Sequence, residues 1–213
     1  MYIPKHFEEQ RIEVLHELIR SHSLATIITQ SGEELNANHI PLHLVDSRGQ
    51  FGVLQGHVAR ANPILKDLES GMPSLVIFQG PEAYISPSWY ATKKETGKVV
   101  PTWNYAVVHA HGIFRIIDDA AWVRSQLEAF TSHNEAEFDE PWAVSDAPVE
   151  YTDKLLSAIV GIELEITSLT GKWKVSQNQP AQNKTSVISG LSRTGQQRDA
   201  EMASLVCDFG KSK

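Results

Sequence analysis

Three short runs of β-branched and apolar residues, separated by turn signals, most constrain what this chain can fold into. Residues 24–29 and 35–45 are joined through Ser31-Gly32, and residues 51–58 follow a polar turn that ends at Gly49. Connections this short join antiparallel neighbours, because parallel strands need a crossover of about a dozen residues or more. The pattern predicts an antiparallel meander.

The rest of the chain alternates between helical and extended patterns. Apolar residues at helical or alternating spacing, with Asn62 as an N-cap, predict further elements. Residues 80–103 carry prolines and aromatic rings but no helical period, which favours a long functional loop. We expect helices over residues 7–19, 63–71, 119–130, 151–157, 181–189 and 194–209, and strands over 73–79, 104–117 and 162–167.

These patterns predict a mainly β protein with helices, an α+β fold built on a small closed barrel of antiparallel strands. We expect one domain over residues 1–213 with a helical C-terminal extension. A two-domain alternative would place its boundary near residues 143–149. The strand near residue 162 favours the single domain, because it can complete the barrel.

Composition excludes several classes of protein. Cys207 is the only cysteine, so a disulfide framework and a cysteine zinc site are excluded. The formal charge of −7 argues against direct binding of nucleic acid. No secretory signal and no apolar run of membrane-spanning length is visible, so we expect a cytoplasmic protein without membrane contact.

Two polar clusters could hold an anion. His57, Arg60 and the helix start at Asn62 lie within a few residues, and a guanidinium beside a helix N-terminus suits a phosphate. Alternatively, these are a strand histidine, a surface charge and a helix cap. Residues 171–178, in which two lysines flank a tryptophan, could contact phosphate or form a solvated turn.

Aromatic rings alternate with short polar side chains in residues 84–90 and 100–105. This mixture suits a flat, partly polar aromatic ligand, although the rings could instead pin the long loop to the barrel. His109 and His111 point the same way on a strand, but two imidazoles without a carboxylate or thiolate nearby do not predict a metal site.

At these same residues the sequence resembles the PaiB-type FMN-binding negative transcriptional regulators. The similarity extends from residue 1 to about residue 190. The family usually has a basic residue after Ser-Gln-Asn, where this chain has Gln179, and Lys184 is a candidate replacement. The matching stretches are MYIPKHF (1–7), ANHIPL (37–42), GHVARANP (56–63), FQGPEAYISPSWY (78–90), VPTWNYAVVHAHG (100–112) and KWKVSQN (172–178).

The resemblance implies a split β-barrel that pairs as a homodimer with FMN at the subunit interface. It implies that His57, Arg60 and Asn62 hold the phosphate and that Asn38 and His39 lie near the ring or the ribityl chain. Lys172 and Gln177 would be outer contacts. The pocket would be closed, from one subunit or the other, by Ser86, Trp89, Tyr90, Thr102, Trp103 and Asn104.

Three functions remain open at this point. The resemblance implies a flavin-binding repressor, related split barrels suggest a flavin-dependent oxidoreductase, and nine histidines leave room for a haem-binding protein. The sequence shows no helix-turn-helix, and the net charge makes contact with DNA doubtful. No catalytic residue is evident beyond the histidines, and a flavin would bring its own redox chemistry.

Overall fold

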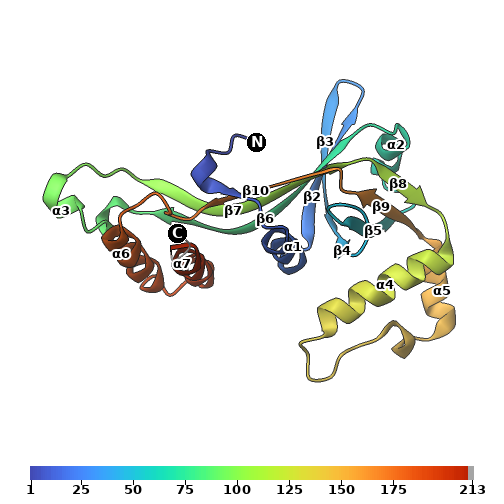
Figure 1. The fold of residues 1–213 in the computed structure, drawn as a ribbon. Coiled ribbons are helices and arrows are strands. Elements are labelled where there is room, and N and C mark those ends of the chain that lie inside the picture. The colour runs from blue at the N-terminus through green and yellow to red at the C-terminus, as the bar shows by residue number, and fades with distance from the viewer. Residues whose placement is uncertain (211–213) are drawn as a thin grey trace. The chain divides into compact units, whose positions relative to one another are not determined.

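The computed structural model describes residues 1–210, whose strands pair antiparallel in two sheets (Figure 1). One sheet has the order β1-β10-β7-β6-β2-β3 and the other β4-β5-β9-β8. The strands are β1 (Glu8–Glu9), β2 (Leu24–Ser31), β3 (Glu34–Pro41), β4 (His43–Val45), β5 (Val53–Ala59), β6 (Ser74–Ile85), β7 (Thr102–Gly112), β8 (Phe114–Ile117), β9 (Ile159–Glu165) and β10 (Ser168–Lys174).

The α-helices are α1 (Ile12–Ser21), α2 (Ile64–Glu69), α3 (Lys93–Thr96), α4 (Ala120–Glu135), α5 (Val149–Ser157), α6 (Ala181–Ser192) and α7 (Gln197–Gly210). Three 3-10 turns complete the elements: η1 (Lys5–Phe7), η2 (Pro87–Trp89) and η3 (Val144–Asp146). None of the helices within residues 1–210 is long and apolar enough to cross a membrane.

The chain divides into two compact units, each made of separate segments. Within the described residues, unit 1 contains residues 1–18, 79–108 and 170–210, and unit 2 contains residues 19–78 and 109–169. The single domain expected over residues 1–213 stays a prediction. The alternative boundary near residues 143–149 falls inside unit 2.

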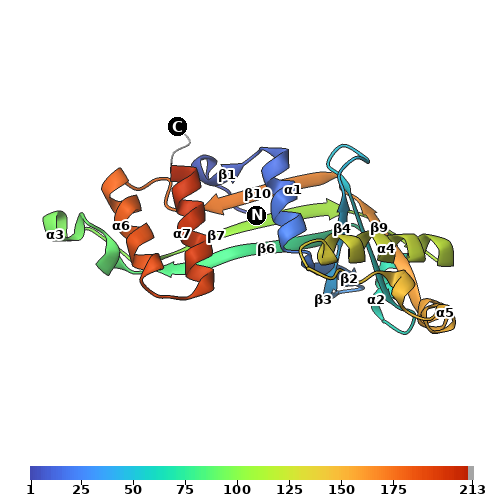
Figure 2. The same ribbon diagram turned by 90° about the horizontal axis from the view of Figure 1, so that it is seen from below.

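Unit 1 is built on the β1-β10-β7-β6 part of the first sheet, with α6 and α7 on one face (Figures 1 and 2). The rings of Trp173 in β10 and Phe209 in α7 stack 6.0 Å apart and join that helix to the sheet. Gly171 allows α1 to approach β10, because a Cβ there would lie 2.2 Å from a methyl group of Leu15. This packing fixes the strands that carry the candidate site.

Unit 2 contains the β2–β3 hairpin and the second sheet. Its core includes Ile27, Leu54, Ile162 and Leu164, all fully buried. Asp119 caps α4, because its carboxylate accepts hydrogen bonds from two backbone N–H groups of the first turn. The predicted helix near residue 119 is therefore confirmed.

The predicted single meander over residues 24–58 is wrong, because the run 35–45 is two strands. β3 pairs with β2 and β4 pairs with β5 in the other sheet. The break follows Pro41, which has no N–H to continue the ladder, and the N–H of Leu42 donates instead to the carbonyl of Ser23. Two antiparallel hairpins replace the three-stranded meander.

The predicted long loop over residues 80–103 is also wrong in part. β6 continues to Ile85, and η2 and α3 follow it. Gly80 is not a turn residue, because a Cβ there would lie 2.8 Å from a methyl group of Leu18 in α1. The glycine serves a close approach of helix to strand.

Three further expectations are corrected. The strand expected over residues 104–117 breaks at Ile113 into β7 and β8, which belong to different sheets. Residues 171–174, a contact or solvated turn by sequence, form the end of β10, where Trp173 is buried. The expected helix at residues 7–19 begins only at Ile12. The mixed α+β composition with antiparallel strands is confirmed.

Candidate functional site

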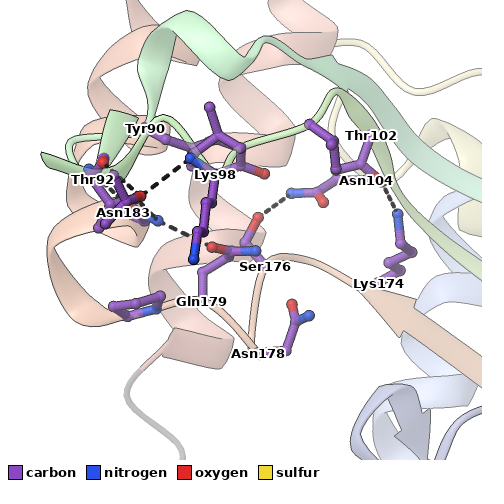
Figure 3. A pocket seen from close by; sticks show the side chains of 14 residues that line it. Tyr90, Thr92, Lys98, Thr102, Asn104, Lys174, Ser176, Asn178, Gln179 and Asn183 are labelled. Atoms are coloured by element: carbon purple, nitrogen blue, oxygen red, sulfur yellow. Dashed lines mark hydrogen bonds between the residues drawn. The ribbon is translucent and has the colours of Figure 1, made fainter. Parts of the chain in front are cut away.

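A polar pocket of about 480 Å³ lies in unit 1 (Figure 3). It lies where the ends of β7 and β10 meet α3 and the start of α6. A volume of this size is typical of a small-molecule site. The lining residues are Tyr90, Thr92, Thr96, Lys98, Val99, Val100, Thr102, Asn104, Lys174, Ser176, Asn178, Gln179, Pro180 and Asn183.

The lining is positively charged within an acidic chain. Lys98 and Lys174 supply two ammonium groups, and none of the lining residues that the structure describes is Asp or Glu. The other polar groups are hydroxyls and amides, which donate hydrogen bonds without a negative charge. The pocket is therefore suited to an anion that also carries many hydrogen-bonding groups.

Ser176 turns the chain from β10 into the pocket. Its φ of 64° is left-handed, which is uncommon for a residue other than glycine. The buried Asn104 amide donates a 2.9 Å hydrogen bond to the Ser176 hydroxyl. This bond joins the turn to β7 and holds both side chains at the pocket wall.

Asn183 joins α6 to the segment before α3. Its side-chain oxygen accepts from the backbone N–H of Thr92, and its amide nitrogen donates to the Thr92 hydroxyl, both at 3.1 Å. The same nitrogen lies 3.1 Å from the side-chain oxygen of Gln179. The buried Asn183 side chain therefore fixes two walls of the pocket at once.

Lys174 is held in place before any ligand binds. Its ammonium donates to the Thr102 hydroxyl and to the backbone carbonyl of Trp103. Burial lowers the pKa of Lys174, and the nearby charge of Lys172 lowers it further. A partly desolvated ammonium of this kind gains more from an added negative charge than an exposed one does.

Tyr90, which directly follows η2, lines the pocket, whereas Trp89 in η2 does not. Burial raises the pKa of Tyr90, so its phenol stays a neutral hydrogen-bonding group. Trp89 packs on α6 at Gly190, where a Cβ would lie 2.4 Å from the indole ring. Trp89 is not among the lining residues, and its role in this structure is to join η2 to α6.

Among the predicted site residues in unit 1, the structure brings Tyr90, Thr102 and Asn104 together at the pocket. The hydroxyl of Ser86 instead caps η2, and Trp103 is exposed with its ring 5.9 Å from that of Tyr84. The two predicted outer contacts bond within the chain instead: Lys172 donates to the carbonyl of Tyr2, and Gln177 bonds the backbone of residues 173 and 175.

The predicted phosphate residues lie in unit 2, and the structure gives each a partner within the chain. Both terminal nitrogens of the Arg60 guanidinium bond the Asp118 carboxylate, and its Nε donates to the carbonyl of Ser157. His57 Nδ1 lies 3.1 Å from the side-chain oxygen of Gln126. The side-chain oxygen of Asn62 accepts a 3.0 Å hydrogen bond from the N–H of Ile64 at the start of α2, although Pro63 and not Asn62 is the N-cap. A phosphate at Arg60 would have to compete with that carboxylate, so the assignment stays a prediction.

Asn38 and His39 lie on opposite faces of β3. Asn38 lines a shallow hollow of unit 2 together with Asn36, Asn62 and Asp67, and His39 is exposed. The predicted ligand roles of both residues stay predictions. Within residues 1–210 no group of three or more metal-ligating side chains occurs.

Sequence reasoning gave Lys98 and Asn183 no place in a cofactor site, although both line the pocket. Lys174 and Ser176 belong to the segment 171–178, which by sequence could contact phosphate or form a solvated turn. Gln179, marked as a departure from the family pattern, lines the pocket, whereas Lys184 lines a different hollow beside Trp173. The position where this sequence departs from the family pattern therefore belongs to the pocket, but the cations there are Lys98 and Lys174.

Comparison with known proteins gives one family and several relatives. The family model described as "Putative FMN-binding domain" matches residues 1–168. The chain is 36% identical to an uncharacterized protein of Emericella nidulans, covering 100% of this chain and 99% of that protein. It is 30% identical to the protease synthase and sporulation protein PAI 2 of Bacillus subtilis, covering 98% of this chain and 97% of that protein.

Solved structures share the fold. A FAD and heme binding protein from Mycobacterium smegmatis aligns with a TM-score of 0.61 and 20% identity, over 78% of this chain and 73% of that one. The flavocytochrome Anf3 from Azotobacter vinelandii aligns with a TM-score of 0.59 and 15% identity, over 81% and 72%. These likenesses confirm the predicted split-barrel fold.

Proposed function

Since the chain belongs to the family of FMN-binding domains, we propose that it binds FMN in the polar pocket of unit 1. The chain is also similar to PAI 2 over almost its whole length. The observation that carries this assignment is the lining itself. It offers two ammonium groups, several hydroxyls and amides, and no carboxylate among the described lining residues.

The lining fits the chemistry of FMN. The phosphate needs cations and N–H donors, the ribityl chain needs groups that both donate and accept, and the edge of the ring needs donors for its carbonyl oxygens. Lys98 meets the first need, and Thr92, Thr102 and Ser176 meet the second. Asn104 and Asn178 offer amides for the third.

When bound, FMN supplies one- or two-electron redox chemistry. The protein's part is to hold and orient it. Asn183 and Asn104 keep the pocket walls in place through their buried hydrogen bonds, and Lys174 presents a fixed positive charge. Tyr90 offers a neutral phenol at the buried side.

The active unit we propose is a homodimer in the cytoplasm with FMN at the subunit interface. The resemblance to PaiB-type proteins supports this arrangement. It leaves Asn38, His39 and His57 of unit 2 as candidates for contacts to FMN held by a partner subunit.

We propose that the protein acts as an FMN-dependent regulator, as its similarity to the sporulation protein PAI 2 suggests. A formal charge of −7 does not favour direct DNA binding, so regulation would act through another route. A flavin-dependent oxidoreductase is the second candidate, and rapid reduction of bound flavin by NADH or NADPH would favour it.

A titration with FMN tests the site. We expect a yellow 1:1 complex per chain and at least tenfold weaker binding by Asn178→Leu, because this exposed side chain lines the pocket and leucine removes the hydrogen bonds that its amide offers. Gln182→Leu, an exposed change on α6 outside the lining, is the matched control. Equal affinity of both variants would refute the pocket, and a Soret band with haem but no flavin binding would refute the cofactor.

A further inference from the structure

The two lysines of the pocket differ in solvent exposure and in their hydrogen-bond partners. Figure 3 shows Lys174 beside Thr102, whereas Lys98 extends toward Gln179 and Ser176. Lys98 is exposed, whereas Lys174 is half-buried. Resting on the proposed function, we propose that Lys98 binds the phosphate of FMN, and that Lys174 faces the isoalloxazine ring and favours its reduced form.

Lys98 has the properties of a phosphate ligand. The structure gives its ammonium neither a hydrogen bond nor an ion pair within residues 1–210, so the full charge is available. It follows Gly97, whose φ of 64° ends α3 and turns the chain. A phosphate carries close to two negative charges at neutral pH, and its desolvation is costly, so it belongs at the exposed side of a pocket.

Lys174 has the properties of a ring contact. Its ammonium is already oriented by the Thr102 hydroxyl and the Trp103 carbonyl, at the end of a strand. It lies on the side of the pocket that holds the buried Asn104. A flat ring with few charges can be desolvated there at little cost.

A fixed cation beside the ring changes the balance between oxidised and reduced flavin. Two electrons and one proton convert neutral oxidised isoalloxazine into an anion. A partly desolvated ammonium stabilises that anion more than the neutral oxidised ring. The protein should therefore bind reduced FMN more tightly than oxidised FMN, and removal of the Lys174 charge should reverse part of that difference.

Affinities for FMN and riboflavin separate the two roles, because the ligands differ only in the phosphate. We expect Lys98→Met to weaken FMN binding at least tenfold and to leave riboflavin binding unchanged, as expected for a charge-assisted contact to phosphate. Lys93→Met, which changes an exposed lysine of α3 outside the lining, is the matched control. Loss of riboflavin affinity in Lys98→Met, or equal FMN affinity in all three proteins, would overturn the phosphate assignment.

The sequence assigned the phosphate to Arg60, so Arg60→Ala decides between the two assignments. We expect this variant to bind FMN like the wild type, because Asp118 already occupies the guanidinium. A tenfold loss of FMN affinity with unchanged riboflavin affinity would restore Arg60 and refute Lys98.

Reductive titration with dithionite against a dye of known potential tests Lys174. We expect Lys174→Gln to lower the ratio of the affinities for reduced and oxidised flavin by about tenfold, a shift of about 30 mV for a two-electron couple. Lys98→Met should leave the potential unchanged. An unchanged potential in Lys174→Gln would overturn the ring assignment.

Lys174→Arg serves if the glutamine variant does not fold, because it keeps the charge but not the geometry. We expect Lys174→Arg to change the ratio of the affinities for reduced and oxidised flavin by less than tenfold. Where Lys174→Gln also folds, the potential of Lys174→Arg should lie closer to that of the wild type. A full tenfold shift in the arginine variant would refute a role of charge. Failure of the wild type to bind any flavin would refute the proposed function instead.

Discussion

At the scale of single residues, Glu163 is the most strongly perturbed acid of unit 2. Its side chain is buried and accepts hydrogen bonds from Arg48, Gln55 and Arg115. Burial alone would raise its pKa, but these three partners outweigh burial and lower the pKa to about 2. The buried Glu163 side chain therefore stays ionised because of these three hydrogen-bond partners.

We expect Arg48→Ala to cost about 1.5–3 kcal/mol of stability at pH 7, because a buried carboxylate loses a charged hydrogen bond. A depressed pKa contributes stability above the unfolded value of about 4.5 that is lost as pH falls toward 2. The cost of Arg48→Ala should therefore shrink in acid, as urea unfolding at pH 7 and pH 3 would measure.

Arg124→Ala is the control for this change, since Arg124 pairs with the exposed Asp153. We expect a cost below about 1 kcal/mol for such a surface pair. Equal costs for the two variants, or no dependence on pH for Arg48→Ala, would contradict the assignment.

His43 in β4, like Glu163, makes the protein less stable as pH falls, but for a different reason. Burial lowers its pKa, and the charges of His133 and Arg20 lower it further, while Asp46 opposes them. The unfolded chain therefore binds the proton more readily, so stability falls as pH drops through about 6.5.

We expect His43→Gln to lose less stability than the wild type between pH 8 and pH 5, measured by denaturant unfolding. His133→Gln removes the neighbouring charge, and an NMR titration should then show the His43 pKa moving up toward its usual value. A His43 resonance that titrates identically in both proteins would disprove the coupling.

Residues of the pocket could be predicted from the sequence only where neighbouring residues of one strand carry them. Thr102 and Asn104 were predicted and line the pocket, because a strand that alternates polar and aromatic residues presents them together. Lys98 and Lys174 were not predicted as partners, since they are 76 positions apart by their residue numbers and only the tertiary fold brings them to one pocket.

At the scale of secondary structure elements, α6 and η2 depend on one glycine. A Cβ at Gly190 would lie 2.4 Å from the Trp89 ring, closer than atoms can approach. An alanine inside a helix ordinarily gains up to about 1 kcal/mol over glycine. Here we expect Gly190→Ala to cost on the order of 1–3 kcal/mol, because overpacking outweighs that gain.

Thermal or urea unfolding measures this cost, with Ser189→Ala on the exposed side of α6 as the control. The double variant Gly190→Ala with Trp89→Ala should be less destabilised than the sum of the two single changes, because the clash is gone. Strict additivity would show that the ring and the helix are not coupled.

Elements were predictable from periodicity and caps, but sheet membership was not. Helices α4, α5 and α6 follow local spacing and were found within a few residues. The breaks at Leu42 and Ile113 were missed, because they occur where a continuous extended run passes from one sheet to the other. That change depends on partners distant in sequence, which a single sequence does not reveal.

At the scale of the whole molecule, the division into two units makes the location of ligand binding measurable. All pocket residues belong to unit 1, whereas Asn38, His39, His57, Arg60 and Asn62 belong to unit 2. The family resemblance and the pocket therefore point to different parts of the same chain. Whether a bound FMN contacts the pocket residues of unit 1, the five residues of unit 2 or both can be measured.

Hydrogen exchange with and without FMN tests this directly. Binding stabilises the folded protein by about 2.7 kcal/mol at a free ligand concentration of 100 Kd. We expect slower exchange in peptides of unit 1 that carry the pocket, above all the end of β10 and the start of α6. Protection confined to peptides of unit 2 would contradict the pocket.

Protection of both units is the result expected if FMN contacts both sets, and the dimer then makes a further demand. If the second set belongs to a partner subunit, protection of residues 56–63 should weaken when dilution yields monomers, while the pocket peptides keep theirs at saturating FMN. Light scattering at each concentration gives the oligomeric state. Protection of residues 56–63 that persists in the monomer would place both sets of contacts within one chain and contradict the interface site.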